Sequence, residues 1–207
     1  MKGGVPVVMG MTTDPFSLLG LEPTAALDAA VVRQVFQERA AAVHPDHGAD
    51  AADRAERTAL FASLNEAQRK LSSTPQRLRV LLQIRYPELA ASHAGAAMDG
   101  AFMELFGAVG AALEKAKAVQ SRRAGVASAL ARAMLMADET VAADAVMAAL
   151  GAVNEAMGEL ERSLPALDET MRSGEACGPQ LKAAAARAGF LEKWQVQLRA
   201  AHAGAVG

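Results

Sequence analysis

Alanine makes up 49 of the 207 residues, and no other feature of the sequence constrains the fold as strongly. Alanine is the best helix former, whereas strands favour aromatic and β-branched residues. The sequence has one tryptophan, one tyrosine and six phenylalanines, so the aromatic strand formers are scarce. We therefore expect an all-α protein, and we exclude a β-sandwich or a β-barrel.

The composition also limits what the chain binds. The formal net charge is −2, so no basic excess attracts a nucleic-acid backbone. The single cysteine, Cys177, rules out an internal disulfide and a cysteine-cluster zinc site. No apolar run is long enough to span a bilayer, and the apolar stretch at residues 5–9 is too short for a signal-peptide core. We expect a cytoplasmic protein without a nucleic-acid or membrane partner, and interpret residues 1–13 as a flexible tail or an early start codon.

Residues 14–85 have the pattern of four helices. Asp14, or the threonine before it, caps a short helix that ends at Gly20. Asp28 caps a longer helix that ends before Pro45, because proline disfavours helical geometry in the residue before it. A third helix is expected from about residue 51 to residue 71, and a short fourth helix follows a break at Ser72. Because a short loop joins the two long helices, we predict an antiparallel hairpin.

The remaining sequence predicts a linker over residues 86–98 and a helical bundle over residues 99–203. Asp99 caps the first bundle helix. Its expected core stripe consists of Phe102, Phe106, Val109 and Leu113. A later seam steps by three and four residues through Met147, Leu150, Val153, Met157, Leu160 and Leu164. The last helix carries Leu181, Ala185, Ala188, Leu191, Trp194 and Leu198. Three or four helices are needed to cover these stripes.

The tripeptide His44-Pro45-Asp46 lies in the loop of the predicted hairpin. The octapeptide at residues 14–21 precedes it, and Phe61, residues 64–67 and Leu71 follow it. This arrangement resembles a J-domain, with which J-proteins drive ATP hydrolysis in DnaK-type chaperones.

The finer spacing is similar to that of the HscB-type J-proteins, which serve iron–sulfur cluster assembly. Five residues separate Gly20-Leu21 from Leu27-Asp28, and fifteen separate Asp28 from His44. Residues 73–82 resemble the family's fourth helix, residues 101–104 the opening of its bundle, and residues 189–193 part of its last helix. The resemblance implies a J-domain over residues 14–85. It also implies a co-chaperone, not itself an enzyme, that recruits a DnaK/HscA-type chaperone and delivers an IscU-type iron–sulfur scaffold protein.

The chemistry of the motif fits such a role. Pro45 stiffens the turn and so reduces the entropy lost on docking. Asp46 offers an acceptor-only carboxylate that suits a bidentate arginine of a partner. The His44 ring can donate a hydrogen bond to a backbone or side-chain acceptor. The resemblance implies that Asp46 contacts an arginine of the chaperone, and that the second helix, with Arg33 and Arg39, supplies the docking face.

Two stretches depart from the family pattern. Typical J-domains are strongly basic just before the motif, but Arg33 and Arg39 are the only cations of the second helix. This difference predicts weaker electrostatic steering, and hence slower association or a different dedicated chaperone. In the bundle, residues 107–111 replace acidic residues with which the family grips the scaffold.

The resemblance assigns scaffold contacts to an apolar group in the bundle. Its members are Phe102, Met103, Phe106 and Phe190. Phe102 and Phe106 belong to the expected core stripe. Met103 is therefore the better interface candidate, since methionine suits adaptable apolar contacts.

Two other interpretations stay open. The bundle could bind another client or dimerise, because the alanine-rich seam at residues 147–164 permits close helix packing. His44 and His47 could instead belong to a small helical metalloenzyme. A zinc site needs a third and a fourth ligand, and His93 and His202 lie far away in the sequence. We expect no catalytic residue, metal or cofactor.

Overall fold

The structure is a computed structural model, and it describes residues 14–44, 46, 48–92, 95, 98–125 and 128–206. All regular elements in these residues are helices, which confirms the all-α prediction. The tail predicted at residues 1–13 lies outside the described residues. No helix in the described ranges has the length and apolar character needed to cross a membrane.

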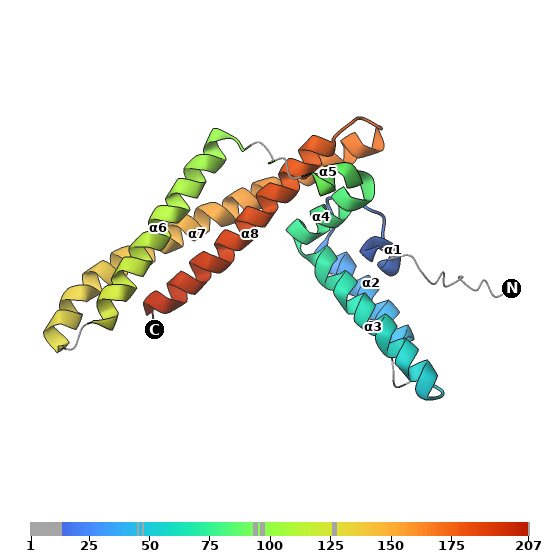
Figure 1. Cartoon of the computed structure of the whole chain (residues 1–207), viewed down its shortest axis with the longest axis horizontal. Coiled ribbons are helices and arrows are strands. Elements are labelled where there is room, and N and C mark those ends of the chain that lie inside the picture. Colours follow the sequence, from blue (N-terminus) through green and yellow to red (C-terminus); the bar gives the residue numbers. More distant parts are fainter. Residues whose placement is uncertain are drawn as a thin grey trace.

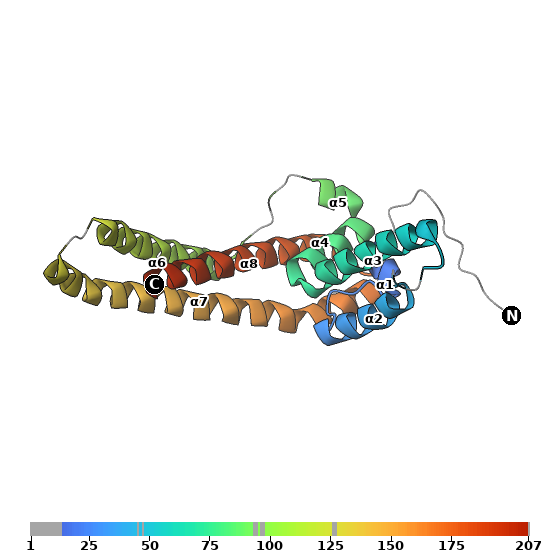
Figure 2. The ribbon, with the colours of Figure 1, turned by 90° about the horizontal axis from the view of Figure 1, so that it is seen from below.

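The predicted hairpin is present. Helix α1 (Pro15–Leu19) is followed by α2 (Ala29–Ala42) and α3 (Ala51–Ser72), which lie side by side in both views (Figures 1 and 2). Asp14 and Asp28 cap α1 and α2 as expected. Gly20 ends α1 at a φ of 62°, a left-handed conformation that favours glycine. The buried side chains Phe16, Leu19, Val32, Leu64 and Leu71 fill the space between these helices and α4.

The segment predicted as a linker is partly helical. Helix α4 (Thr74–Arg85) leads directly into α5 (Pro87–Ala91), whose first residue is a proline, as favoured at that position. Helix α5 packs on the start of α8. The Lys182 Nζ atom donates to the Ser92 carbonyl at 2.9 Å, and the Leu89 side chain lies against Gly178. Residues 86–92 are therefore held to the bundle by their own contacts.

Three long helices form the bundle: α6 (Gly100–Ala124), α7 (Ala129–Arg172) and α8 (Gly178–Val206). Helices α6 and α8 lie on the same side of α7 (Figure 2). The last turn of α6 and the first turn of α7 reach beyond the C-terminal end of α8 (Figures 1 and 2). The bundle is thus of the three-helix kind, and α7 runs along its whole length.

The predicted core stripes are correct for α8 and partly wrong for α6 and α7. All six α8 residues of the predicted stripe are buried. On α6, however, the buried face follows residues 102, 109, 112 and 116, which turns Phe106 to the edge with 53% of its surface exposed. On α7, Val146 and Ala149 face the core, and Met147 is exposed. Alanines in the core let the helices approach closely, which shifts the buried face away from the larger side chains.

A buried polar network joins the N-terminal helices to the bundle. Asp168 of α7 accepts hydrogen bonds from the backbone nitrogens of Ala25 and Ala26, at 2.6 and 2.8 Å. The buried Arg77 of α4 donates from Nε to the Ala25 carbonyl at 2.8 Å. Thr74 donates to Glu161 of α7 at 2.8 Å. These contacts fix the α1–α2 loop and α4 against α7.

Candidate functional site

The tip of the α2–α3 hairpin presents a carboxylate to solvent. The Asp46 side chain is 84% exposed, and the neighbouring His44 side chain is 46% exposed. Pro45 and His47 lie outside the described residues, so the stiff turn predicted for Pro45 stays a prediction. Of the described residues here, the Asp46 carboxylate faces solvent and the His44 ring is partly covered.

His44 is held against α3 by its ring. The His44 and Phe61 rings meet edge to face at 5.8 Å between centroids, and Phe61 in turn packs on Phe36 of α2 at 6.4 Å. The backbone nitrogen of Asp46 donates to His44 Nδ1 at 3.3 Å. The imidazole therefore braces the turn, and the Asp46 carboxylate stays accessible above it.

The far side of the turn is tied down by Asp53 and Arg57 of α3. Asp53 accepts from the Ala49 backbone nitrogen at 2.9 Å and from Arg57 Nε at 3.0 Å. The Ala49 hydrogen bond, followed by that of Arg57, lowers the pKa of Asp53. Arg57 also donates to the Ala42 carbonyl at 3.3 Å, so it links the end of α2 to the start of α3. The hairpin end is thus braced on both sides of Asp46.

The two arginines of α2 have different surroundings. Arg33 is exposed on the helix. Arg39 donates from Nη1 to the Leu18 carbonyl at 2.9 Å, and its guanidinium lies directly against Gly20. Arg39 therefore fastens α1 to α2, in addition to the docking role predicted for it. Gly20 also leaves room for this guanidinium, since a Cβ atom there would collide with it.

Three of the four predicted scaffold contacts, Phe102, Phe106 and Phe190, gather around Trp194. The fourth, Met103, follows Phe102 in the chain, and we call these five residues the aromatic patch: Phe102, Met103, Phe106, Phe190 and Trp194. Phe102 stacks on Trp194 at 5.1 Å between ring centroids, and both side chains are buried. The Phe106 and Phe190 rings each lie 5.9 Å from the Trp194 ring. Met103, Phe106 and Phe190 are all exposed. Phe102 is thus the floor of the patch, and the other three predicted residues form its accessible surface.

Arg187 and Asp99 border the aromatic patch. The Arg187 guanidinium carbon lies 4.9 Å from the centre of the Phe102 ring, within the range of a cation–π contact. Arg187 also donates to Asp99 at 2.7 Å. Asp99 caps α6 through the Phe102 backbone nitrogen; this hydrogen bond, followed by that of Arg187, lowers the pKa of Asp99. Sequence reasoning missed Arg187, although it precedes Phe190 by three residues and so shares its helix face.

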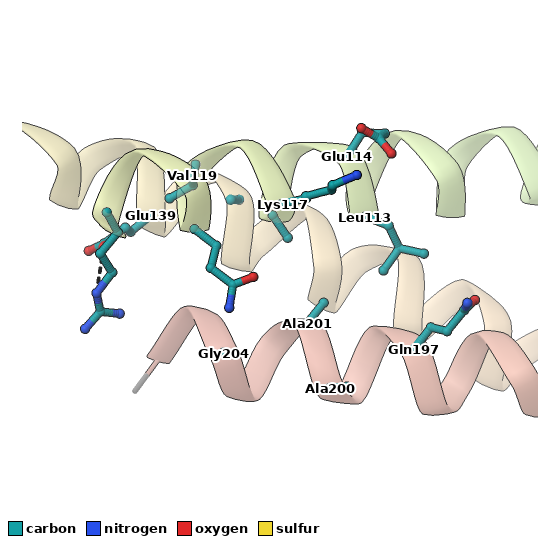
Figure 3. Close-up of a pocket in the computed structure, with 13 residues that line it drawn as sticks. Leu113, Glu114, Lys117, Val119, Glu139, Gln197, Ala200, Ala201 and Gly204 are labelled. Atoms are coloured by element: carbon teal, nitrogen blue, oxygen red, sulfur yellow. Dashed lines mark ion pairs between the residues drawn. The ribbon is translucent and has the colours of Figure 1, made fainter. Parts of the chain in front are cut away.

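A separate groove of about 350 Å³ lies between α6, α7 and α8 near the C-terminal end of the bundle (Figure 3). Small residues such as Ala142, Ala201 and Gly204 line it, and an ion pair joins Arg123 and Glu139 at one end (Figure 3). None of the residues predicted for the site lines this groove. No group of three His, Cys, Asp or Glu residues within the described ranges is arranged to hold a metal ion.

No protein-family model matches the sequence. Among solved structures, the chain is similar to "Chaperone HscB from Vibrio cholerae", with a TM-score of 0.52 and 20% sequence identity. The match covers 90% of this chain and 96% of that chain. The likeness shows an HscB-like helical fold along nearly the whole length of both chains.

Proposed function

We propose that the chain is a J-domain co-chaperone of the HscB type. In this role it stimulates the ATPase of a DnaK/HscA-type chaperone through His44, Pro45 and Asp46. The observation that carries the proposal is the Asp46 carboxylate, which stands 84% exposed at the end of a braced antiparallel hairpin. The HscB-like fold supports the proposal, because this chain combines that fold with the hairpin and the His44-Pro45-Asp46 motif.

The proposed action needs no chemistry on this chain, which is therefore not an enzyme. An arginine of the chaperone donates two hydrogen bonds to the Asp46 carboxylate, a pairing that is strong because both groups are charged. The hairpin binds the hydrolysis-competent conformation of the chaperone more tightly than the other conformation. This differential affinity shifts the chaperone population toward hydrolysis.

The bundle is proposed to carry the client, an IscU-type iron–sulfur scaffold protein, on the aromatic patch. Exposed aromatic and methionine side chains over a packed floor are the composition of an interface centre. Phe106 and Phe190 form such a surface on the buried Trp194, and Met103 is an exposed apolar side chain next to Phe102 in the chain. The polar network of Asp168 and Arg77 holds the hairpin and the patch in one arrangement, so that chaperone and client are presented together.

The first test is the ATPase turnover of a DnaK/HscA-type chaperone with wild-type protein and with Asp46→Asn or His44→Gln. A hydrogen bond to a charged group contributes about 1.5–3 kcal/mol. Asp46→Asn should therefore raise the concentration of the chain needed for half-maximal stimulation roughly ten- to a hundredfold. The matched control is Glu56→Gln, which removes an exposed carboxylate from α3 and should keep full stimulation. Equal and negligible stimulation by wild type and His44→Gln would overturn the proposal.

The metalloenzyme interpretation gives a different pattern in the same set of variants. It predicts bound metal in the purified protein and an activity that is lost in His47→Ala. The co-chaperone proposal instead predicts that His47→Ala is mild and that His44→Gln is severe.

The second test is retention of the purified scaffold protein by immobilised chain. Phe106→Ser and Phe190→Ser should each lower retention at least tenfold, because each removes a large side chain from the centre of the patch. Val196→Ser is the control, since Val196 is similarly exposed on α8 but is not part of the patch. Retention of an unrelated client without any binding of scaffold would instead favour the alternative in which the bundle serves another client.

A further inference from the structure

Cations border the aromatic patch on the surface of α8. Arg187 precedes Phe190 by three residues and Lys193 follows it by three, so the two cations lie on either side of its ring along the helix. Lys193 is exposed, and the Arg187 side chain is 30% exposed. The accessible ring of Phe190 is therefore flanked by a positive charge on both sides.

A third cation reaches the same place from another helix. Arg79 is exposed on α4, and its Nη2 atom lies against Gly189, the residue before Phe190. The glycine leaves room for this guanidinium, because a Cβ atom at residue 189 would lie 2.8 Å from Nη2. We call Arg79, Arg187 and Lys193 the basic border. It joins two helices that pack on each other.

The charges of the basic border are only partly neutralised within the chain. In the described ranges, neither Arg79 nor Lys193 has an ion-pair partner. Arg187 has one, Asp99, at 2.7 Å. That aspartate also accepts a hydrogen bond from the Phe102 backbone nitrogen at the start of α6. The border therefore keeps a net positive charge beside exposed apolar side chains.

Apart from the aspartate that caps α6, the acidic residues of α6 and α8 lie away from the patch. Glu104 is two residues from Phe106, and so lies about 160° around α6 from that ring. Glu192 has the same relation to Phe190 on α8. Glu114 lies about 12 Å beyond Phe106 along α6. A partner carboxylate at the basic border is therefore close to cations, and the carboxylate of the cap is already bonded to the border.

The number of cations favours a protein surface over a membrane. Segments that bind anionic lipids typically carry about four to eight lysines or arginines, whereas the basic border has three members. Aromatic side chains together with arginine are instead the composition of energetic centres in protein interfaces. Charges that border such a centre select partners of opposite charge and speed their association.

We propose that the aromatic patch and its basic border bind an acidic protein surface, in which an apolar side chain is flanked by aspartate or glutamate. The apolar side chain packs on Phe106 and Phe190, and the flanking carboxylates pair with the basic border. The guanidinium groups of the border suit carboxylates, because their donors match the two oxygens. This inference rests on the client-binding role proposed for the patch, and it adds the charge of the client surface.

Two synthetic peptides test the charge of the partner directly on the full chain. Both carry the same leucines at helical spacing, and the flanking positions are glutamate in one peptide and lysine in the other. Trp194 is the only tryptophan of the chain and is 4% exposed beneath the patch, so its fluorescence reports binding there. The glutamate peptide should bind roughly tenfold more tightly than the lysine peptide at low salt, and about 1 M salt should remove most of this difference.

The same fluorescence measurement identifies the outcomes that contradict the proposal. Equal affinity for the two peptides, tighter binding of the lysine peptide, or binding of neither peptide would overturn it. Vesicles of phosphatidylcholine and phosphatidylglycerol should leave the fluorescence unchanged. A response to these vesicles without a response to the glutamate peptide would assign the basic border to a membrane surface, and would also overturn the proposal.

Reversal of one charge on the chain gives a matched test. Lys193→Glu should weaken binding of the glutamate peptide roughly tenfold and should strengthen binding of the lysine peptide. The control is Arg199→Glu, because Arg199 is an exposed cation nine residues after Phe190 and so lies on the opposite side of α8. That variant should bind both peptides as wild type does. Circular dichroism checks that each variant is folded, and equal effects of the two substitutions would refute the assignment.

Retention of the IscU-type scaffold protein separates this inference from the proposed function. Lys193→Glu should retain less scaffold than Arg199→Glu does. If both variants retain the scaffold as wild type does, the acidic surface is refuted while the proposed client stands. If the glutamate peptide binds as expected but no scaffold is retained, the proposed client is wrong and the acidic surface stands.

Discussion

Replacement of Asp168 by alanine should loosen the attachment of the hairpin unit to the bundle. Asp168 is 6% exposed, and its two carboxylate oxygens accept from the Ala25 and Ala26 backbone nitrogens at 2.6 and 2.8 Å. The buried Arg77 guanidinium lies next to this site and bonds to the Ala25 carbonyl. The alanine variant leaves two backbone donors without an acceptor and removes a counter-charge of Arg77.

The size of the effect follows from these contacts. A hydrogen bond to a charged group contributes about 1.5–3 kcal/mol, and the Asp168 carboxylate accepts two such bonds. Burial lowers the pKa of Arg77, and the nearby Glu161 and Asp168 oppose that shift. We expect Asp168→Ala to lower the free energy of unfolding by about 3–5 kcal/mol. For a chain of this size that corresponds to a fall in Tm of roughly 6–20 °C.

Thermal unfolding followed by circular dichroism measures this loss, and amide hydrogen exchange at Ala25 and Ala26 locates it. The control is Glu169→Ala, which removes a neighbouring carboxylate that is exposed and pairs with Arg172 at the surface. An exposed ion pair of this kind contributes less than about 1 kcal/mol. If Asp168→Ala were no more destabilising than Glu169→Ala, the assignment of Asp168 as the anchor of the α1–α2 loop would be wrong.

Three further outcomes are expected. Gly20→Ala should destabilise by at least about 1–2 kcal/mol in urea unfolding, because its φ of 62° disfavours a Cβ atom and Arg39 occupies the adjacent space. Arg39→Met should cost about 1 kcal/mol of stability by losing the bond to the Leu18 carbonyl, whereas Arg33→Met should leave stability unchanged and only slow chaperone association. Folding lowers the pKa of Asp99, so its contribution to stability is present above the unfolded pKa near 3.8 and disappears as the pH falls through the folded pKa. Urea titrations between pH 2 and 6 should therefore show a shallower acid loss in Asp99→Asn than in wild type.

The features that depend on neighbouring residues were predictable from the sequence. The caps at Asp14, Asp28 and Asp99 and the left-handed Gly20 follow from local backbone chemistry. The α2–α3 hairpin follows from two amphipathic helices and a short loop. The α8 stripe was correct because that helix repeats large apolar residues, with alanines between them, at regular helical spacing.

The features that depend on distant residues were not predictable in the same way. Phe106 has the spacing of a core residue, but the bundle closes on alanines 112 and 116 and leaves its ring at the edge. The contact of Asp168 with the α1–α2 loop joins residues more than 140 positions apart. An aspartate in an amphipathic helix has the sequence signature of a solvent-exposed residue, and only the tertiary fold brings the α1–α2 loop to it. The burial of Arg77 could not be predicted for the same reason, because the Ala25 carbonyl that it bonds to lies 52 positions away.

Helix α7 connects the hairpin unit to the bundle. Its C-terminal end contacts the hairpin unit, and its first half belongs to the bundle. Its C-terminal end holds the hairpin unit through Asp168, and Val141 in its first half is 61% exposed. These positions are 27 residues, or about 40 Å, apart along the helix, so they share no contacts. Substitutions at such distances usually add within about 0.5 kcal/mol. The loss of stability in Asp168→Ala should therefore be the same, within that margin, whether or not Val141→Glu is also present. A clear departure from additivity would show that the exposed first half of α7 and the attachment of the hairpin unit are coupled along the helix.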